Sequence, residues 1–273
     1  MTNLFEIDQT KCKGDGICAA SCPVGIIIMR RNIPTLLPNA EARCINCGHC
    51  VSVCPHAALS LNKMPIAQCA PIKSELESSA DQVEQLLKSR RSIRIYKPEP
   101  IQKDVLTNLI DTARYGPTGT NAQPVHWTVI YEAEKVKHLA ETVIDWMRGM
   151  KNDPVSHPMA SYFEPLIIAW DKGKDAVCRS APHLVIASSS DAQRSGSMDC
   201  TIALTYFSLA ALPYGIGTCW AGIVQIAAAM SPTVNKALNL PQGHRCQGAM
   251  MVGYPRYQYH RIPLRNEAPV QWV

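Results

Sequence analysis

A chain of 273 residues, 47% of them hydrophobic and 18% charged, is long enough for one or two folded domains. Its net charge of +5, from 27 Lys and Arg against 22 Asp and Glu, is too small and too evenly spread to indicate a nucleic-acid partner. The longest apolar runs fall far below the roughly 18 residues that a membrane span needs, and the first residues lack a basic flank before an apolar core. We therefore expect a soluble, cytoplasmic protein that binds neither membrane nor nucleic acid.

The N-terminal quarter contains two cysteine-rich stretches with one frame. Residues 44–55 read CINCGHCVSVCP, and residues 12–23 read CKGDGICAASCP, with aspartate in place of the second cysteine. Three cysteines at i, i+3 and i+6, then a fourth followed by proline, are typical of an iron–sulfur cluster loop whose last cysteine serves a second cluster. The repeat therefore predicts two clusters.

These stretches resemble the bacterial two-cluster ferredoxins over roughly residues 1–63. By the cross-over rule of that family, one [4Fe–4S] cluster would be bound by Cys22, Cys44, Cys47 and Cys50, and the other by Cys12, Cys18 and Cys54. The fourth corner of the second cluster stays open: Asp15 could ligate iron, or the corner could lack iron and leave a [3Fe–4S] cluster. Zinc or disulfides are the alternatives, although zinc knuckles pair two CxxC units and do not need the CxxxCP ending.

The other elements of this segment are short. Strands are expected at residues 4–8, with matching strand or helix pieces at 25–29 and 57–61. Residues 64–80 contain prolines and serines without a sustained period, which predicts a linker to a second domain at 81–273.

The second domain opens with a short helix for which Asp81 is the expected N-cap. This helix ends in SRRSIRIY, residues 89–96, a compact group of arginines and serines. The guanidinium groups of its arginines match the geometry of phosphate oxygens. Taken alone, such a basic run is more often a solvated face than a binding site.

Four motifs in order change that interpretation. RRSIR is followed by a helix at residues 100–115, the loop PTGTNAQP, a helix at 198–212, GIGTCWAG and VGYP. Together they resemble the nitroreductase family of FMN-dependent flavoproteins. The resemblance implies an α+β fold, a central sheet flanked by helices, and a homodimer whose interface contains the helix at 198–212.

The resemblance also implies roles for particular residues. The FMN phosphate would be bound by Arg90, Ser92 and Arg94, with Arg91 contributing through its backbone, and by Arg256 or Arg261 from the segment after VGYP. The flavin ring would be contacted from the opposite subunit by Pro117, Thr118 and Gly119, and from the same subunit by Asn121 and Gln123.

The GIGTCWAG segment would pass over the flavin N5 atom. A backbone N–H of Ala221 or Gly222 would donate there, and Trp220 would stack nearby, although a core tryptophan is an almost equal interpretation. Residues 145–165 resemble a variable lid, in which Arg148, His157 and Tyr162 could contact substrate. No dedicated catalytic acid or base is expected.

The expected function is therefore an iron–sulfur flavoprotein oxidoreductase. Reduced FMN, fed by the clusters, would reduce a nitroarene, quinone or activated alkene, because the flavin carries the redox chemistry. The electron donor would be a low-potential, ferredoxin-like carrier or NAD(P)H. Two alternatives remain: an electron-transfer module between a carrier protein and FMN, and a reductive dehalogenase or flavin-modifying relative.

Overall fold

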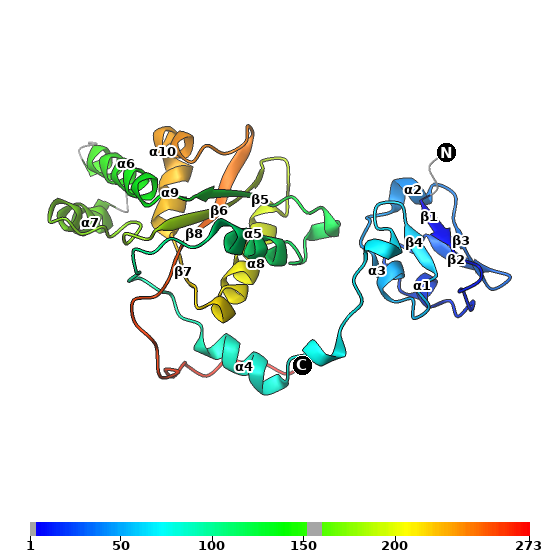
Figure 1. Ribbon diagram of the computed structural model, residues 1–273. Coiled ribbons are helices and arrows are strands. Elements are labelled where there is room, and N and C mark those ends of the chain that lie inside the picture. The colour runs from blue at the N-terminus through cyan, green and yellow to red at the C-terminus, as the bar shows by residue number, and fades with distance from the viewer. Residues whose placement is uncertain (1–3, 152–159) are drawn as a thin grey trace. The chain divides into compact units, whose positions relative to one another are not determined.

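The computed structural model describes residues 4–151 and 160–273, and the chain divides into two compact units (Figure 1). One unit comprises residues 1–77 and 119–122, and the other comprises residues 78–118 and 123–273. Residues 64–77, expected as part of a linker, thus group with the N-terminal unit. No helix within the described residues is long and apolar enough to cross a membrane.

The N-terminal unit contains two antiparallel pairs of strands, β1 with β4 and β2 with β3, joined by single helical turns. Its small core mixes aliphatic side chains with cysteines: Leu59 and Leu61 lie beside Cys18 and Cys50. The strands expected near both ends of this segment are confirmed. The elements are β1 (Phe5–Ile7), α1 (Ile17–Ala20), β2 (Ile27–Arg30), β3 (Ile33–Leu36), α2 (Ala40–Arg43), α3 (His49–Ser52), β4 (Leu59–Leu61), η1 (Ile66–Gln68) and η2 (Ser74–Leu76). The short turn η3 (Gly119–Asn121) also belongs to this unit.

The C-terminal unit is built on one antiparallel sheet with strand order β5-β6-β8-β7. Helices cover it on both faces (Figure 1). Its elements are α4 (Ala80–Ser89), α5 (Lys103–Ala113), β5 (His126–Ile130), α6 (Ala133–Lys151), α7 (Ala160–Asp171), β6 (His183–Ser190), α8 (Gly196–Ala210), η4 (Leu212–Tyr214), β7 (Gly217–Trp220), α9 (Gly222–Met230), α10 (Pro232–Ala237) and β8 (His244–Gly253).

The central strand β6 shows why both faces need helices. Leu184 and Ile186 belong to the core shared with α6, α9 and α10, whereas Val185 and Ala187 belong to the core shared with α5 and α8. Successive side chains of a strand point to opposite faces, so a strand that is apolar at every position must be buried on both sides. The expected α+β fold with a central sheet between helices is confirmed.

One local expectation was wrong. The N-cap of α4 is Ser79 rather than Asp81: the Ser79 hydroxyl accepts from the Gln82 N–H, and the Gln82 side chain accepts from the Ser79 N–H, which completes a capping box. Within the expected lid, residues 145–151 lie in helix α6 and residues 160–165 lie in helix α7.

A buried histidine ties β6 to the chain before α5. The fully buried His183 ring accepts a hydrogen bond from the Ile101 N–H (2.8 Å) through Nε2, and Nδ1 lies 2.6 Å from the Tyr131 carbonyl oxygen. Because a carbonyl can only accept, Nδ1 must donate, so the neutral ring satisfies both partners. Burial lowers the pKa of His183 from its usual value of 6.5.

We predict that protonation of His183 destabilises the C-terminal unit in acid. The folded-state pKa is depressed, so the unfolded chain takes up the proton first as the pH falls below 6.5. Stability is therefore fully present above that pH and falls by up to about 1.4 kcal/mol per pH unit below it. Urea unfolding followed by tryptophan fluorescence, in the wild type and in His183→Gln, measures this difference. An identical pH slope in the two proteins would contradict the prediction.

Candidate functional site

Four cysteines of the N-terminal unit line one hollow, and they come from both cysteine-rich stretches: Cys22, Cys44, Cys47 and Cys50. The Cys44 sulfur also accepts from the Asn46 N–H at 3.4 Å, a contact that stabilises a thiolate. The fold thus brings together the set that the cross-over rule assigned to the first cluster.

A second hollow gathers the remaining predicted ligands: Cys12, Asp15, Cys18 and Cys54. Asp15 is exposed, and its carboxylate oxygen Oδ1 accepts from the Ile17 N–H (3.1 Å) at the start of α1. Gly14 and Gly16 flank it with φ values of 68° and 76°, a left-handed backbone that glycine adopts without strain. One carboxylate oxygen is therefore engaged locally, and the other remains available to an iron atom.

The chemistry of both hollows fits iron–sulfur clusters. Burial, together with the neighbouring Cys22, Cys47 and Cys44, raises the pKa of the Cys50 thiol to about 11. Burial also raises the pKa of Cys18, and Asp15, Cys54 and Cys12 add to this effect. Gathered thiolates repel one another, and bound iron supplies the positive charge that offsets this repulsion. Within residues 4–151 and 160–273, no three His, Cys, Asp or Glu side chains lie close enough together to bind a single metal ion.

The C-terminal unit contains a basic hollow of about 360 Å³, lined by Arg90, Arg91, Ser92, Arg94, Tyr259 and Arg265. The segment that supplies the three arginines and Ser92 runs along β7, because the Ile93 N–H donates to the Thr218 carbonyl (3.0 Å). Gly217 permits this approach: a Cβ there would lie 2.4 Å from Ile93 Cγ1. Three of the six lining residues had been assigned to a phosphate by their side chains, and Arg91 by its backbone.

Neither of the two arginines that we expected to close this hollow, Arg256 and Arg261, is among the residues that line it. The Arg256 N–H donates to the Ile95 carbonyl at 3.0 Å, and Arg256 is exposed outside the lining, whereas Arg265 reaches it. Tyr259 and Arg265 were missed because the segment after β8 forms no helix or strand and hence has no period to locate its side chains. The signal available was the run of basic residues in RYQYHRIPLR.

The PTGTNAQP loop is held by its own polar groups. Thr120, Asn121 and Gln123 have left-handed φ values of 52°, 55° and 48°. The Thr118 hydroxyl accepts from the Gln123 N–H at 3.0 Å, and Pro117 and Gly119 are exposed. Within the N-terminal unit as defined above, the Asn121 side-chain amide donates to the Asn46 carbonyl at 2.9 Å. The flavin contacts assigned to this loop stay predictions.

The segment at the end of β7 requires one correction. The Ala221 N–H donates to the Ala249 carbonyl at 2.8 Å, so it is not the donor to a flavin that we expected. Gly222 begins α9, where N–H groups have no partner within the helix, and a Cβ at Gly222 would meet no atom within 4 Å. Gly222 is therefore the better candidate. Trp220 is 38% exposed and lies against Gly248.

An apolar cavity of about 260 Å³ begins one residue after Gly222. Helices α6, α7 and α9 supply its lining: Trp146, Met147, Tyr162, Phe163, Leu166, Ile223 and Ile226. All seven side chains are uncharged, and three are aromatic, so the cavity suits a planar, neutral molecule.

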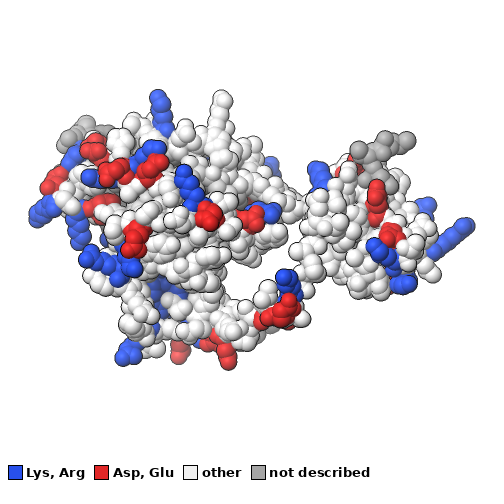
Figure 2. Space-filling model, viewed as in Figure 1, with Lys and Arg blue, Asp and Glu red and all other residues white. Residues whose placement is uncertain are grey.

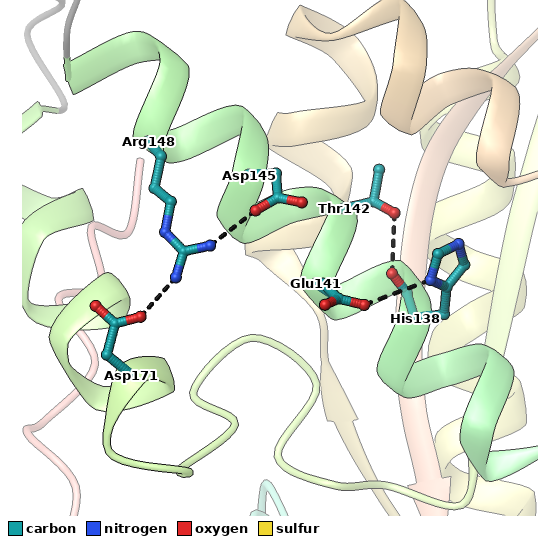
Figure 3. A network of polar contacts seen from close by, with 6 residues as sticks. All are labelled: His138, Glu141, Thr142, Asp145, Arg148 and Asp171. Carbon is teal, nitrogen blue, oxygen red and sulfur yellow. Dashed lines mark hydrogen bonds and ion pairs between the residues drawn. The ribbon is translucent and has the colours of Figure 1, made fainter.

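Arg148, expected to contact substrate, instead joins two helices. Its guanidinium donates to Asp145 (2.8 Å) on α6 and to Asp171 (2.5 Å) on α7, as Figure 3 shows. Figure 3 also shows the Thr142 hydroxyl donating to the His138 carbonyl (2.9 Å), so the exposed face of α6 is a polar network. Tyr162 lines the apolar cavity as expected for a lid residue, and His157 lies outside the described residues.

Comparison with known proteins agrees with this geometry. The model of the nitroreductase family matches residues 87–254, which contain the sheet, the basic arginines and the segment around Gly222. The chain belongs to the nitroreductase family. The model of a 4Fe-4S dicluster domain matches residues 10–59, which contain both cysteine hollows. These matches confirm the expected FMN-dependent oxidoreductase and its two iron–sulfur clusters.

Individual relatives of this nitroreductase are distant. An iodotyrosine deiodinase from Thermotoga neapolitana is 25% identical over 68% of this chain and 95% of its own length. An iodotyrosine deiodinase from Danio rerio is 31% identical, but the match spans only 30% of this chain and 28% of that protein. A Bacteroides fragilis nitroreductase with bound FMN shares the fold, with a TM-score of 0.55 and 24% identity over 70% of this chain and 95% of that one.

We predict that Arg90 and Arg265, but not Arg256, contribute to FMN affinity. Arg90→Ala removes a charge-assisted phosphate contact and should weaken binding roughly 10- to 150-fold, and Arg265→Ala roughly 10-fold because it is exposed. Arg256→Ala is the matched control and should leave the affinity unchanged. Fluorescence titration of the apoprotein with FMN measures all three. Equal losses in Arg265→Ala and Arg256→Ala would place the phosphate elsewhere.

We predict that Asp15 makes one iron of the second cluster labile. A carboxylate is a poorer ligand for cluster iron than a thiolate, so mild oxidation should yield a [3Fe–4S] resonance in electron paramagnetic resonance spectra. Asp15→Cys should suppress that resonance and raise the retained iron. The same spectrum from both proteins would mean that Asp15 does not ligate iron.

Proposed function

We propose that this nitroreductase reduces a neutral, electrophilic aromatic or alkene acceptor with electrons that a low-potential carrier delivers through its two clusters. The observation that carries the proposal is that one chain contains two hollows that each gather four candidate cluster ligands, a basic hollow suited to a phosphate, and an apolar cavity beside Gly222. Bound FMN would accept electrons singly and pass them on in pairs.

The residues of the C-terminal unit would position the flavin rather than react with the acceptor. Arg90, Arg94 and Arg265 would bind the phosphate through guanidinium hydrogen bonds. The Gly222 N–H, at the positive end of α9, would donate toward the flavin ring and favour developing negative charge there. The acceptor would lie in the cavity that starts at Ile223, against its aromatic and aliphatic walls.

Charge supports a neutral acceptor. The seven side chains that line the cavity carry no positive group, and the nearest arginine of α6, Arg148, is already paired with two aspartates. A carboxylate placed there would lose its hydration without gaining a partner. Nitrobenzene should therefore be a better acceptor than 4-nitrobenzoate.

Exposed apolar side chains support a homodimer. Met198 on α8 is 69% exposed and Tyr206 is 41% exposed, although the opposite face of this helix is buried. In the segment after β8, Leu264 is 97% exposed and Trp272 is 93% exposed. A second copy of the chain would cover these groups permanently and could supply Pro117, Thr118 and Gly119 to the neighbouring flavin.

A reductive dehalogenase is the second candidate, because a relative 25% identical over 68% of the chain is an iodotyrosine deiodinase. The cavity favours neutral iodophenols over the zwitterionic iodotyrosine for the same reason of charge.

The test uses the full chain with FMN and both clusters bound, under anaerobic conditions, and measures the order in which the cofactors are reduced. We predict that a reduced low-potential carrier bleaches first the clusters and then the flavin, faster than NADH or NADPH does, and that nitrobenzene then reoxidises the flavin at least about 10-fold faster than 4-nitrobenzoate. Rapid-scan absorbance and product analysis provide the readout, with 4-iodophenol as the dehalogenation probe. Flavin that is reduced by NADPH while the clusters stay oxidised would contradict the route through the clusters. If none of these acceptors reoxidises the flavin, the result would favour the alternative function of an electron-transfer module between a carrier protein and FMN.

A further inference from the structure

The two cysteine hollows are built on one repeated stretch of backbone. Cys12 of the first stretch matches Cys44 of the second, and Gly16 matches Gly48. The two glycines have φ values of 76° and 75°, and each is the N-cap of a four-residue helix, α1 or α3. The two hollows therefore differ mainly in the side chains that surround them.

Apolar side chains surround the first hollow, which is the one lined by Cys22, Cys44, Cys47 and Cys50. Eight large apolar side chains contribute to its lining: Leu4, Phe5, Val24, Ile26, Ile27, Leu36, Ile45 and Leu61. Seven of the eight belong to the apolar core of this unit or pack against it. Apart from the cysteines, His49 is the ionisable residue of this lining, and it is exposed. A cluster in the first hollow thus lies against the core.

The second hollow, which contains Asp15, has fewer apolar residues and more polar ones. Besides Asp15 and the cysteines, its lining includes Ile7, Lys13, Pro34, His56, Ala58 and Leu59. At equivalent positions of the repeat, Lys13 replaces Ile45 and His56 replaces Val24. Lys13 and His56 are exposed, whereas Ile45 and Val24 are partly buried. The second hollow is therefore the more open and the more polar of the two.

This difference in surroundings acts on the reduction of a cluster. Reduction adds one electron to a group that its thiolate ligands already make anionic. An apolar wall disfavours the added negative charge because it cannot solvate that charge, whereas water and a nearby cation favour it. Solvent exposure and local charge are accordingly among the factors that set cluster potentials.

Other charges near the hollows do not remove the difference. Lys11 is already paired with Asp8 at 3.2 Å, whereas Lys13 forms no ion pair within the described residues. Arg43 donates to the Val24 carbonyl at 2.9 Å, but Arg43 is exposed and does not line the first hollow. Figure 2 shows both basic and acidic side chains on the face of this unit that is in view, so the contrast is local to the hollows.

We propose that the cluster in the second hollow has the higher reduction potential and that Lys13 and His56 set the difference between the two clusters. The first electron from a donor then goes to the second cluster: the donor is oxidised, the cluster is reduced, and no bond forms or breaks. An electron on the first cluster is the more strongly reducing one. The proposal rests on the two clusters, and not on the donor or the acceptor of the proposed function.

The experiment exchanges side chains between equivalent positions of the repeat. Lys13→Ile with His56→Val gives the second hollow the residues of the first. Lys63→Ile is the control, because Lys63 is exposed, lines neither hollow and gives the same change in formal net charge. The full chain with FMN and both clusters bound is titrated with dithionite under anaerobic conditions, in the presence of ferrous iron. Low-temperature electron paramagnetic resonance then gives the two cluster midpoint potentials.

We expect two different midpoint potentials in the wild type, and the double variant should lower the higher one alone. At the wild-type midpoint, the ratio of reduced to oxidised second cluster should fall about tenfold, which corresponds to about 59 mV for one electron. The control should leave both potentials unchanged. Lys13→Arg keeps the positive charge and should therefore keep the wild-type potential.

The reverse exchange applies the same rule to the first hollow. Ile45→Lys with Val24→His should raise the lower potential and leave the higher one in place. Because both positions are partly buried, Val24→Gln is the milder variant, which adds polarity without charge and should shift the same potential in the same direction by less.

The proposal would be overturned by equal potentials in the wild type. It would also be overturned if Lys13→Ile with His56→Val moves the lower potential, or moves neither, or moves both as the control does. Loss of iron from this variant would assign Lys13 or His56 to cluster binding instead. The proposed function fails on a different result, namely that reduced clusters never reduce the flavin.

Discussion

The close approach of residues 92–96 to β7 is the contact on which the C-terminal unit's site depends. The Ile93 N–H donates to Thr218, the Tyr96 backbone pairs with Pro255, and the Lys97 N–H donates to Tyr254 at 2.8 Å. This one stretch therefore holds the arginines of the basic hollow against β7 and against the segment after β8. Only glycine at position 217 leaves room for Ile93, so the missing side chain lets the segment that contains the arginines of the basic hollow lie against β7.

The same strand positions the rest of the site. The chain passes from β7 through Ala221, whose N–H is fixed by Ala249, into the first turn of α9. Gly222 thus lies at a helix N-terminus with open space above it, and the next residues line the apolar cavity. The chain thus connects a candidate backbone donor directly to the apolar cavity within a short piece of strand and helix.

The N-terminal unit depends on a different constraint. Its aliphatic core is small, and the buried cysteines inside it have thiols whose pKa is raised by burial and by one another. A segment of this size has too little apolar surface to fold securely alone, so bound clusters would contribute the missing free energy through their metal–thiolate bonds. The same cysteines would then hold the clusters and stabilise the fold.

The sequence by itself determined what depends on local spacing. The cysteine frames grouped the residues that line both cysteine hollows, and RRSIR contained four of the residues that line the basic hollow, because each of these signals lies within a few consecutive residues. Tertiary structure decided what depends on residues distant in the chain. It used the Ala221 N–H for Ala249, paired Arg148 with Asp171, and brought Arg265 rather than Arg256 to the basic hollow. It also set the β2–β3 hairpin beside the Asp15 loop, where Gly14 leaves room for the Asn32 carbonyl. No periodicity encodes such pairings, since they follow from how strands and loops pack after the chain has folded.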